Sequence, residues 1–158
     1  MVVNDEPLSV YIAGSFRRKE ICVEAGRIIR DAGMFCYVFC DEGSEAFPHS
    51  MKLREENLIE TFTPMTAIEH ETVKKIYAIN MTELEKSDVV LLMLPCGKSA
   101  HMEAGWIKGV DGKVIIYGEM IKGEFDAMYG MADLVTDDFN KVLDHLCVYS
   151  ALKGTGQL

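Results

Sequence analysis

The sequence lacks long hydrophobic runs: no stretch approaches the roughly 18 uncharged apolar residues that a membrane-spanning helix needs. Its first ten residues, MVVNDEPLSV, have no basic start and no long apolar core, so we expect no secretory signal. Basic residues are few, with 16 Lys and Arg against 25 Asp and Glu, for a formal net charge of −9. Because binding to a nucleic-acid backbone depends on Lys and Arg displacing counterions, this balance disfavours polynucleotides and anionic membranes as partners. A small anion at a local basic pocket is not excluded.

Cysteine is scarce and odd in number, and most of its five positions lie inside apolar runs, as buried thiols do in a reducing compartment. We therefore predict a cytoplasmic protein. Cys36 and Cys40 are expected on one face of a strand, but no second Cys or His pair follows at zinc-like spacing, so both are predicted to be core residues without a metal. Neither a Walker loop nor a G-x-G-x-x-G motif occurs, and we expect no cofactor. The cysteines are Cys22, Cys36, Cys40, Cys96 and Cys147.

What is present is the composition of one folded domain: 158 residues, 49% of them apolar and 26% charged. β-Rich runs alternate with helical patterns, which predicts an α/β fold with a parallel sheet and helices on both faces. We expect a doubly wound, flavodoxin-like sheet of order 2-1-3-4-5 over residues 1–150, followed by a polar tail at 151–158. The strands are predicted at residues 8–13, 34–40, 88–94, 113–117 and 132–135, and the helices at 18–32, 66–86, 99–108 and 138–149.

Residues 41–76 interrupt this alternation. They hold eight acidic residues and two prolines, and the part from 41 to 71 has a local net charge of −6. An insertion of this length beside a sheet is more often a lid or a partner surface than an idle loop. We therefore predict an acidic lid there.

In a sheet of this order the binding crevice lies beyond the carboxyl ends of strands 1 and 3. The loop after strand 1 contains Gly14, Ser15 and Arg17, which combine a tight turn, a hydroxyl and a planar cation at a helix N-terminus. This pattern suits a phosphate or a carboxylate. The same residues are also typical of a capped helix with solvated arginines, and the pattern alone favours that interpretation while leaving both open.

The loop and helix after strand 3 carry Glu103, with small residues following it. A carboxylate fixed there could attack a sugar anomeric carbon, or it could simply interact with the helix dipole. Cys96 and His101 suggest a second idea, a thiol–imidazole pair, because a thiol near a helix N-terminus tends to ionise. That pair would need an orienting third group, which the sequence does not identify.

Two motifs together resemble the nucleoside 2-deoxyribosyltransferase-like superfamily, which includes 2′-deoxynucleoside 5′-monophosphate N-glycosidases. They are Tyr-x-x-Gly-Ser-x-Arg from Tyr11 to Arg17 and Gly-x-x-x-His-Met-Glu-x-Gly from Gly97 to Gly105. The resemblance runs from strand 1 to about Asp133, leaves residues 41–76 outside it, and implies a flavodoxin-like fold.

The resemblance also implies roles for particular residues. Glu103 takes the position of the nucleophile that attacks C1′ of the sugar, and Tyr11 would orient it. Ser15 and Arg17, after Gly14, would hold a 5′-phosphate. Ser99 would face the sugar or the phosphate. Asp126 lies in a segment similar to the one that completes the site of a neighbouring subunit, which implies a homodimer or a higher homo-oligomer.

Three positions depart from the family pattern. Asn80 stands where the family usually has an aspartate that assists the departing base, and an amide cannot supply a proton as a general acid. Gly97 replaces a substrate-contacting Asp or Ser, and His101 replaces a small residue. Protonation of the base would then pass to another group, such as His101, or the substrate would differ.

Our leading hypothesis is cleavage of the N-glycosidic bond of a nucleoside or nucleoside 5′-monophosphate, by hydrolysis or by transfer to an acceptor base. Two alternatives remain open at this point. One is a glycohydrolase acting on a nicotinamide dinucleotide, and the other is a non-catalytic nucleotide-binding or signalling module, in which Asn80 marks lost acid catalysis.

Overall fold

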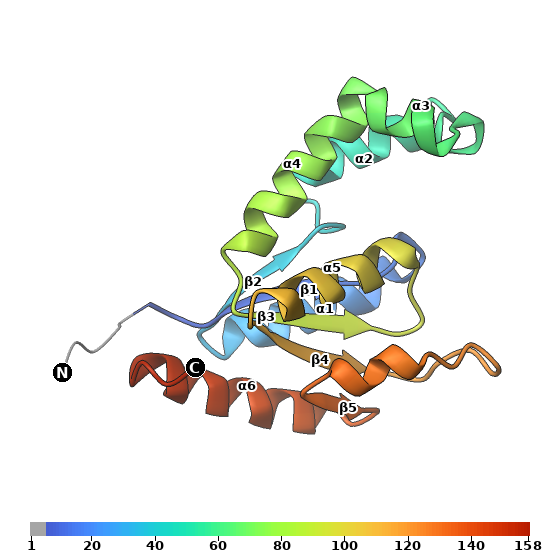
Figure 1. The fold of residues 1–158 in the computed structure, drawn as a ribbon. Helices are drawn as coiled ribbons and strands as arrows, with labels where there is room; N and C mark the ends of the chain where they lie inside the picture. Colours follow the sequence, from blue (N-terminus) through green and yellow to red (C-terminus); the bar gives the residue numbers. More distant parts are fainter. Residues whose placement is uncertain (1–5) are drawn as a thin grey trace.

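The computed structural model describes residues 6–158 and has a five-stranded parallel sheet of order β2-β1-β3-β4-β5 (Figure 1). The predicted α/β fold and strand order are confirmed. Each strand begins and ends within two residues of its predicted bounds. The strands are β1 (Ser9–Ala13), β2 (Phe35–Val38), β3 (Val89–Met93), β4 (Lys113–Tyr117) and β5 (Leu134–Thr136).

Helices cover both faces of the sheet, and the side chains of β1 alternate between the two cores. Val10 and Ile12 face the layer of α1 and α6, whereas Tyr11 and Ala13 face the layer of α5. β3 is buried along its whole length, as expected of a central parallel strand. The flanking helices are α1 (Lys19–Asp31), which the short 3₁₀ turn η1 (Phe16–Arg18) precedes, α5 (Lys98–Gly109) and α6 (Phe139–Gly154).

The C-terminal helix is longer than predicted. It continues to Gly154 and takes in half of the expected polar tail, because Leu152 packs on the core and Lys153 has partners of its own. The Lys153 ammonium donates to the Asp88 carboxylate at 2.8 Å and to the Pro7 carbonyl at 3.1 Å. These contacts tie the end of the chain to the start of β1 and β3.

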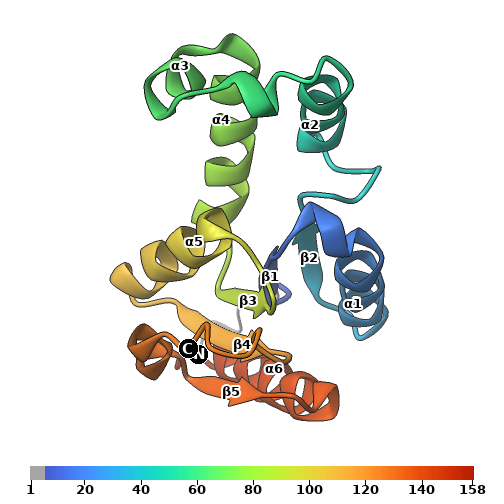
Figure 2. The same cartoon turned by 90° about the vertical axis from the view of Figure 1, so that its right-hand side faces the viewer.

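Residues 41–76 are mostly helical, and with the rest of α4 they form an arm that stands away from the sheet (Figures 1 and 2). The single helix predicted over residues 66–86 is broken at His70, whose backbone is extended. The His70 ring accepts from the Thr72 N–H at 3.2 Å and so caps the second helix. The arm consists of α2 (Ala46–Glu55), the 3₁₀ turn η2 (Ile59–Thr61), α3 (Pro64–Glu69) and α4 (Glu71–Glu85).

The arm is fastened to the loop after β1 by aromatic contacts. Phe47 of α2 stacks on Phe16 of η1 with ring centroids 6.1 Å apart. The Arg54 guanidinium lies 4.1 Å from the centre of the Phe16 ring, and the Lys19 ammonium lies 4.4 Å from that of Phe47. The base of the arm is therefore held against the predicted anion loop.

The prediction that Cys36 and Cys40 share one face of a strand is wrong. Cys40 lies in a turn, two residues beyond the end of β2, although it is buried in the same core that Cys36 packs against. Within residues 6–158, no helix is both long enough and apolar enough to cross a membrane.

Candidate active site

The centre of the site is a hydrogen bond between Tyr11 of β1 and Glu103 of α5. The Tyr11 hydroxyl donates to the Glu103 carboxylate at 2.8 Å, across 92 residues of sequence. Tyr11 is fully buried, so its ring is held by the core and its hydroxyl is aimed at one carboxylate oxygen. The sheet and the helix thus fix the carboxylate in one orientation, as the predicted role of Tyr11 requires.

The environment of Glu103 makes its carboxyl unusually weak as an acid. Burial raises the pKa of Glu103 from 4.5 to about 7, and the hydrogen bond from Tyr11 acts in the opposite direction by favouring the charged form. Burial and the neighbouring carboxylate together raise the pKa of Tyr11, which keeps its hydroxyl protonated as a donor. A carboxylate that titrates near neutrality inside a pocket is typical of functional sites.

Glu103 lines a cavity of about 390 Å³ between α4 and α5. Its polar lining consists of Glu103, Asn80 and Ser99, and its remaining wall is mainly apolar. This combination of an apolar wall with a few convergent polar groups is typical of small-molecule sites. The apolar part of the lining comes from Val73, Ile76, Tyr77, Met81, Leu84, Met102 and Trp106.

Asn80 is held by residues that sequence reasoning missed. The Tyr37 hydroxyl of β2 donates to Asn80 Oδ1 at 2.8 Å, and the Ser44 hydroxyl donates to Tyr37 Oη at 3.2 Å. Burial raises the pKa of Tyr37 to about 12, so this hydroxyl also stays protonated. Tyr37 is the register partner of Tyr11 on the neighbouring strand, and their ring centroids lie 5.2 Å apart. Pairing the predicted parallel strands residue by residue is the signal that could have revealed Tyr37.

The loop after β1 has the local structure expected of a capped turn. Ser15 accepts from the Arg17 backbone N–H at 3.3 Å, and the Arg17 side chain is exposed. Gly14 is required for space rather than for an unusual φ, because a Cβ there would lie 2.6 Å from the Cys22 sulfur. Arg54, which reaches the same loop from the arm, is a second cation that sequence reasoning missed.

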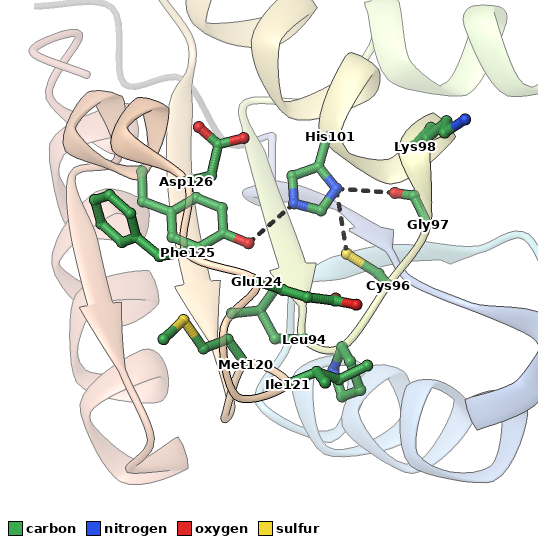
Figure 3. A pocket seen from close by; sticks show the side chains of 12 residues that line it. Leu94, Cys96, Gly97, Lys98, His101, Met120, Ile121, Glu124, Phe125 and Asp126 are labelled. Carbon is green, nitrogen blue, oxygen red and sulfur yellow. Dashed lines mark hydrogen bonds between the residues drawn. The ribbon is translucent and has the colours of Figure 1, made fainter.

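His101 lies in a second cavity, of about 410 Å³, beyond β3 (Figure 3). Its Nδ1 lies 2.8 Å from the Gly97 carbonyl oxygen, and its Nε2 lies 3.1 Å from the Tyr129 hydroxyl. The two rings stack with centroids 5.8 Å apart. Asp126 lines this cavity too, and its carboxylate caps the 3₁₀ turn η3 (Ala127–Met131) by accepting from a backbone N–H.

The structure argues against a thiol–imidazole pair. Cys96 Sγ lies 3.8 Å from His101 Nδ1, but that nitrogen also faces the much closer Gly97 carbonyl. Burial raises the pKa of the Cys96 thiol to about 12, contrary to the lowering expected from its place before a helix. The thiol is therefore neutral near pH 7 and is not poised as a nucleophile.

The predicted site residues thus fall into three groups. Asn80, Ser99 and Glu103 line the cavity between α4 and α5, and Tyr11 contacts Glu103 from the core. Gly97, His101 and Asp126 line the cavity of Figure 3. Gly14, Ser15 and Arg17 form the loop after β1. Within residues 6–158, no three His, Cys, Asp or Glu side chains are grouped as a metal site would need.

The structure of this chain is similar to those of two solved proteins. A 2-deoxyribosyltransferase from the psychrotolerant bacterium Bacillus psychrosaccharolyticus matches 85% of this chain and 89% of its own, with a TM-score of 0.57 and 14% identity. A CMP N-glycosidase from Clostridium botulinum matches 89% of this chain and 98% of its own, with a TM-score of 0.48 and 13% identity. Comparison of the sequence with protein-family models and with curated proteins found no match. The chain therefore shares its α/β fold with a solved 2-deoxyribosyltransferase.

Proposed function

We propose that this protein cleaves the N-glycosidic bond of a nucleoside or a nucleoside 5′-monophosphate, with Glu103 as the nucleophile. The observation that carries the proposal is the carboxylate of Glu103, held by the buried Tyr11 hydroxyl at 2.8 Å and facing a cavity of about 390 Å³. The two motifs that resemble the nucleoside 2-deoxyribosyltransferase-like superfamily contain these two residues, and the fold shared with a 2-deoxyribosyltransferase supports the same conclusion.

In this mechanism an ionised Glu103 oxygen forms a bond to C1′ of the sugar while the C1′–N bond breaks, and its electron pair leaves with the base. Tyr11 keeps the attacking carboxylate in place and donates to one of its oxygens. Water then attacks C1′ of the glycosyl-enzyme, which releases the sugar and regenerates the carboxylate. If an acceptor base attacks instead, the outcome is transfer. The two reactions share the first step.

A 5′-phosphate would bind at the loop after β1. The Ser15 hydroxyl and the exposed Arg17 guanidinium offer it a donor and a planar cation. Arg54 adds a second guanidinium at the same loop. The two guanidinium groups make this loop locally positive, although the chain as a whole has a net charge of −9.

We further propose that the protein works as a homo-oligomer and that the Asp126 segment completes the site of a neighbouring subunit. An apolar groove between α5 and η3 supports such a contact, because two of its lining side chains are largely exposed: Met102 to 76% and Met128 to 59%. Phe125, just before Asp126, is 73% exposed and lines the neighbouring cavity of Figure 3. Mixing the inactive variants Glu103→Ala and Asp126→Ala should restore part of the activity if sites are shared between subunits. Failure of the mixture to regain activity would mean that each subunit is self-sufficient.

The test of the activity is a base-release screen by liquid chromatography over nucleosides, their 5′-monophosphates and NAD, with and without an acceptor base. Release of base by the native protein and its loss in Glu103→Ala would support the proposal, and new nucleoside in the presence of acceptor would identify transfer. Turnover that survives in Glu103→Ala refutes the assigned nucleophile. Nucleotide binding without any base release would instead favour a non-catalytic module, and nicotinamide released from NAD would favour a glycohydrolase.

A further inference from the structure

We infer that Asn80 is a fixed hydrogen-bond donor to the departing base, and that it restricts the enzyme to bases that leave as stabilised anions. The bases that fit are uracil, thymine and hypoxanthine, whose ring amide or imide groups spread negative charge over carbonyl oxygens. Cytosine and adenine do not fit, because each has an exocyclic amino group where uracil or hypoxanthine has a carbonyl, so their ring anions are less stabilised and they leave readily only after protonation. This inference rests on the proposed function.

The Asn80 amide is the last member of a chain of three hydrogen bonds that begins at the Ala46 backbone. The Ala46 backbone N–H donates to Ser44 Oγ at 3.2 Å, so the Ser44 hydroxyl proton is free for another acceptor. Ser44 donates to Tyr37 Oη at 3.2 Å, and the single Tyr37 hydroxyl proton then goes to Asn80 Oδ1 at 2.8 Å. The amide oxygen is therefore occupied by Tyr37, and the NH₂ group of Asn80 faces the other way.

The NH₂ group of Asn80 is free to donate a hydrogen bond to a ligand. No residue within 6–158 accepts a hydrogen bond from Asn80 Nδ2, and no buried polar side-chain atom among these residues lacks a partner, so Nδ2 is not sealed in the core. Asn80 lines the same cavity as Glu103, among Val73, Ile76 and Trp106. A donor in such a mainly apolar wall interacts strongly with a charge that develops nearby.

The Asn80 amide can stabilise the departing base by a hydrogen bond but cannot protonate it. As Glu103 forms its bond to C1′, the electrons of the broken C1′–N bond pass to the ring nitrogen and spread through the ring to a carbonyl oxygen, which lies beside that nitrogen in uracil and thymine and across the ring in hypoxanthine. Asn80 stabilises that oxygen by a hydrogen bond and keeps its own proton, since an amide is far too weak an acid to transfer it. The base departs as an anion and takes a proton from water. An aspartic acid in this position could transfer a proton instead, so the Asn80 amide selects against bases that need one.

Tyr37 is a positioning residue in this scheme, because it acts on the base only through Asn80. Removing its hydroxyl leaves Asn80 Oδ1 without its donor and lets the amide rotate, so that either end can face the cavity. We expect Tyr37→Phe to lower kcat more than it raises KM, and to add little further loss to Asn80→Ala. A purely structural Tyr37 would instead lower stability and leave the ratio between bases unchanged.

The experiment measures initial rates of base release from the uracil, hypoxanthine, cytosine and adenine 5′-monophosphates between pH 5 and 9. Native protein should favour uracil and hypoxanthine at least roughly tenfold, and Asn80→Ala should lower those two rates roughly 10- to 100-fold, the value of a hydrogen bond to a charged group. The near-isosteric Asn80→Asp should gain release of cytosine and adenine on the acid side of its profile. A thermal melt of each variant checks folding.

Equal or faster release of adenine or cytosine by the native protein overturns the inference, as does an unchanged base ratio in Asn80→Ala. Such results would leave the proposed function intact as long as release of any base depends on Glu103. Release of no base from any substrate overturns the proposed function and this inference together.

Discussion

Replacing Glu103 by Gln should stabilise the fold at alkaline pH and not at acid pH. In the folded protein burial raises the pKa of this carboxyl from 4.5 to about 7, whereas the unfolded chain gives up the proton near the ordinary value. Between these two pH values the native state binds more protons than the unfolded state, so raising the pH through this window lowers stability. The loss is complete once the pH passes the folded pKa.

The size of the effect follows from the same two pKa values. One pKa unit corresponds to about 1.36 kcal/mol, so the difference between 4.5 and about 7 amounts to about 3 kcal/mol of lost stability above pH 7. Gln keeps the shape and can still accept from the Tyr11 hydroxyl, but it carries no charge to bury. For a chain of 158 residues, about 3 kcal/mol corresponds to a rise in Tm of roughly 6–12 °C.

The assay is urea unfolding of the native protein and of Glu103→Gln at pH 5 and pH 8, with the exposed Glu55→Gln as the control for removal of one charge. The stability advantage of Glu103→Gln should grow by about 2.5 kcal/mol between the two pH values, because pH 5 already lies slightly above the unfolded pKa of 4.5, while base release is lost. An advantage that is the same at both pH values would refute the reasoning, because it would mean that folding does not disfavour the charged carboxylate.

Three further predictions test other parts of the site. Initial rates should rise as the pH increases through about 7, because Glu103 attacks only when ionised; a rate that falls over this range contradicts its role as nucleophile. Arg17→Ala should raise KM for 5′-monophosphates roughly tenfold and leave KM for nucleosides unchanged, and equal effects on both would refute phosphate recognition. Gly14→Ala should lower the unfolding free energy by about 1–3 kcal/mol, because its Cβ would lie 2.6 Å from a buried sulfur, whereas Gly105→Ala, with open space around it, should be tolerated in a melting experiment.

Much of the fold was predictable because the β-rich runs are short, apolar and separated by helical patterns. β3 illustrates this: its five buried residues identify a central strand without knowledge of any neighbour. The break at His70 was not predictable from periodicity, because it depends on an extended backbone and on a ring that caps the next helix. The same holds for the end of α6, which Lys153 extends through contacts with Asp88, 65 residues away.

The candidate site was predictable in part, and the missing part depends on long-range contacts. Glu103 and Tyr11 were found because each lies in a short motif of recognisable spacing. Tyr37 carries no such motif, and its importance comes from a strand register and from a helix 43 residues away. The raised pKa of Cys96 likewise follows from burial, which local sequence does not report.

The pairing of Tyr11 with Tyr37 across β1 and β2 has a consequence for how this site can vary between related proteins. The two hydroxyls that hold Glu103 and Asn80 come from directly paired positions, so their spacing is set by the sheet itself. Slippage of one residue between these strands would turn one tyrosine to the opposite face and separate the two contacts. Length changes in the arm, in contrast, leave that spacing untouched. The segment between β2 and β3 can therefore change in length without disturbing the contact between Tyr11 and Glu103.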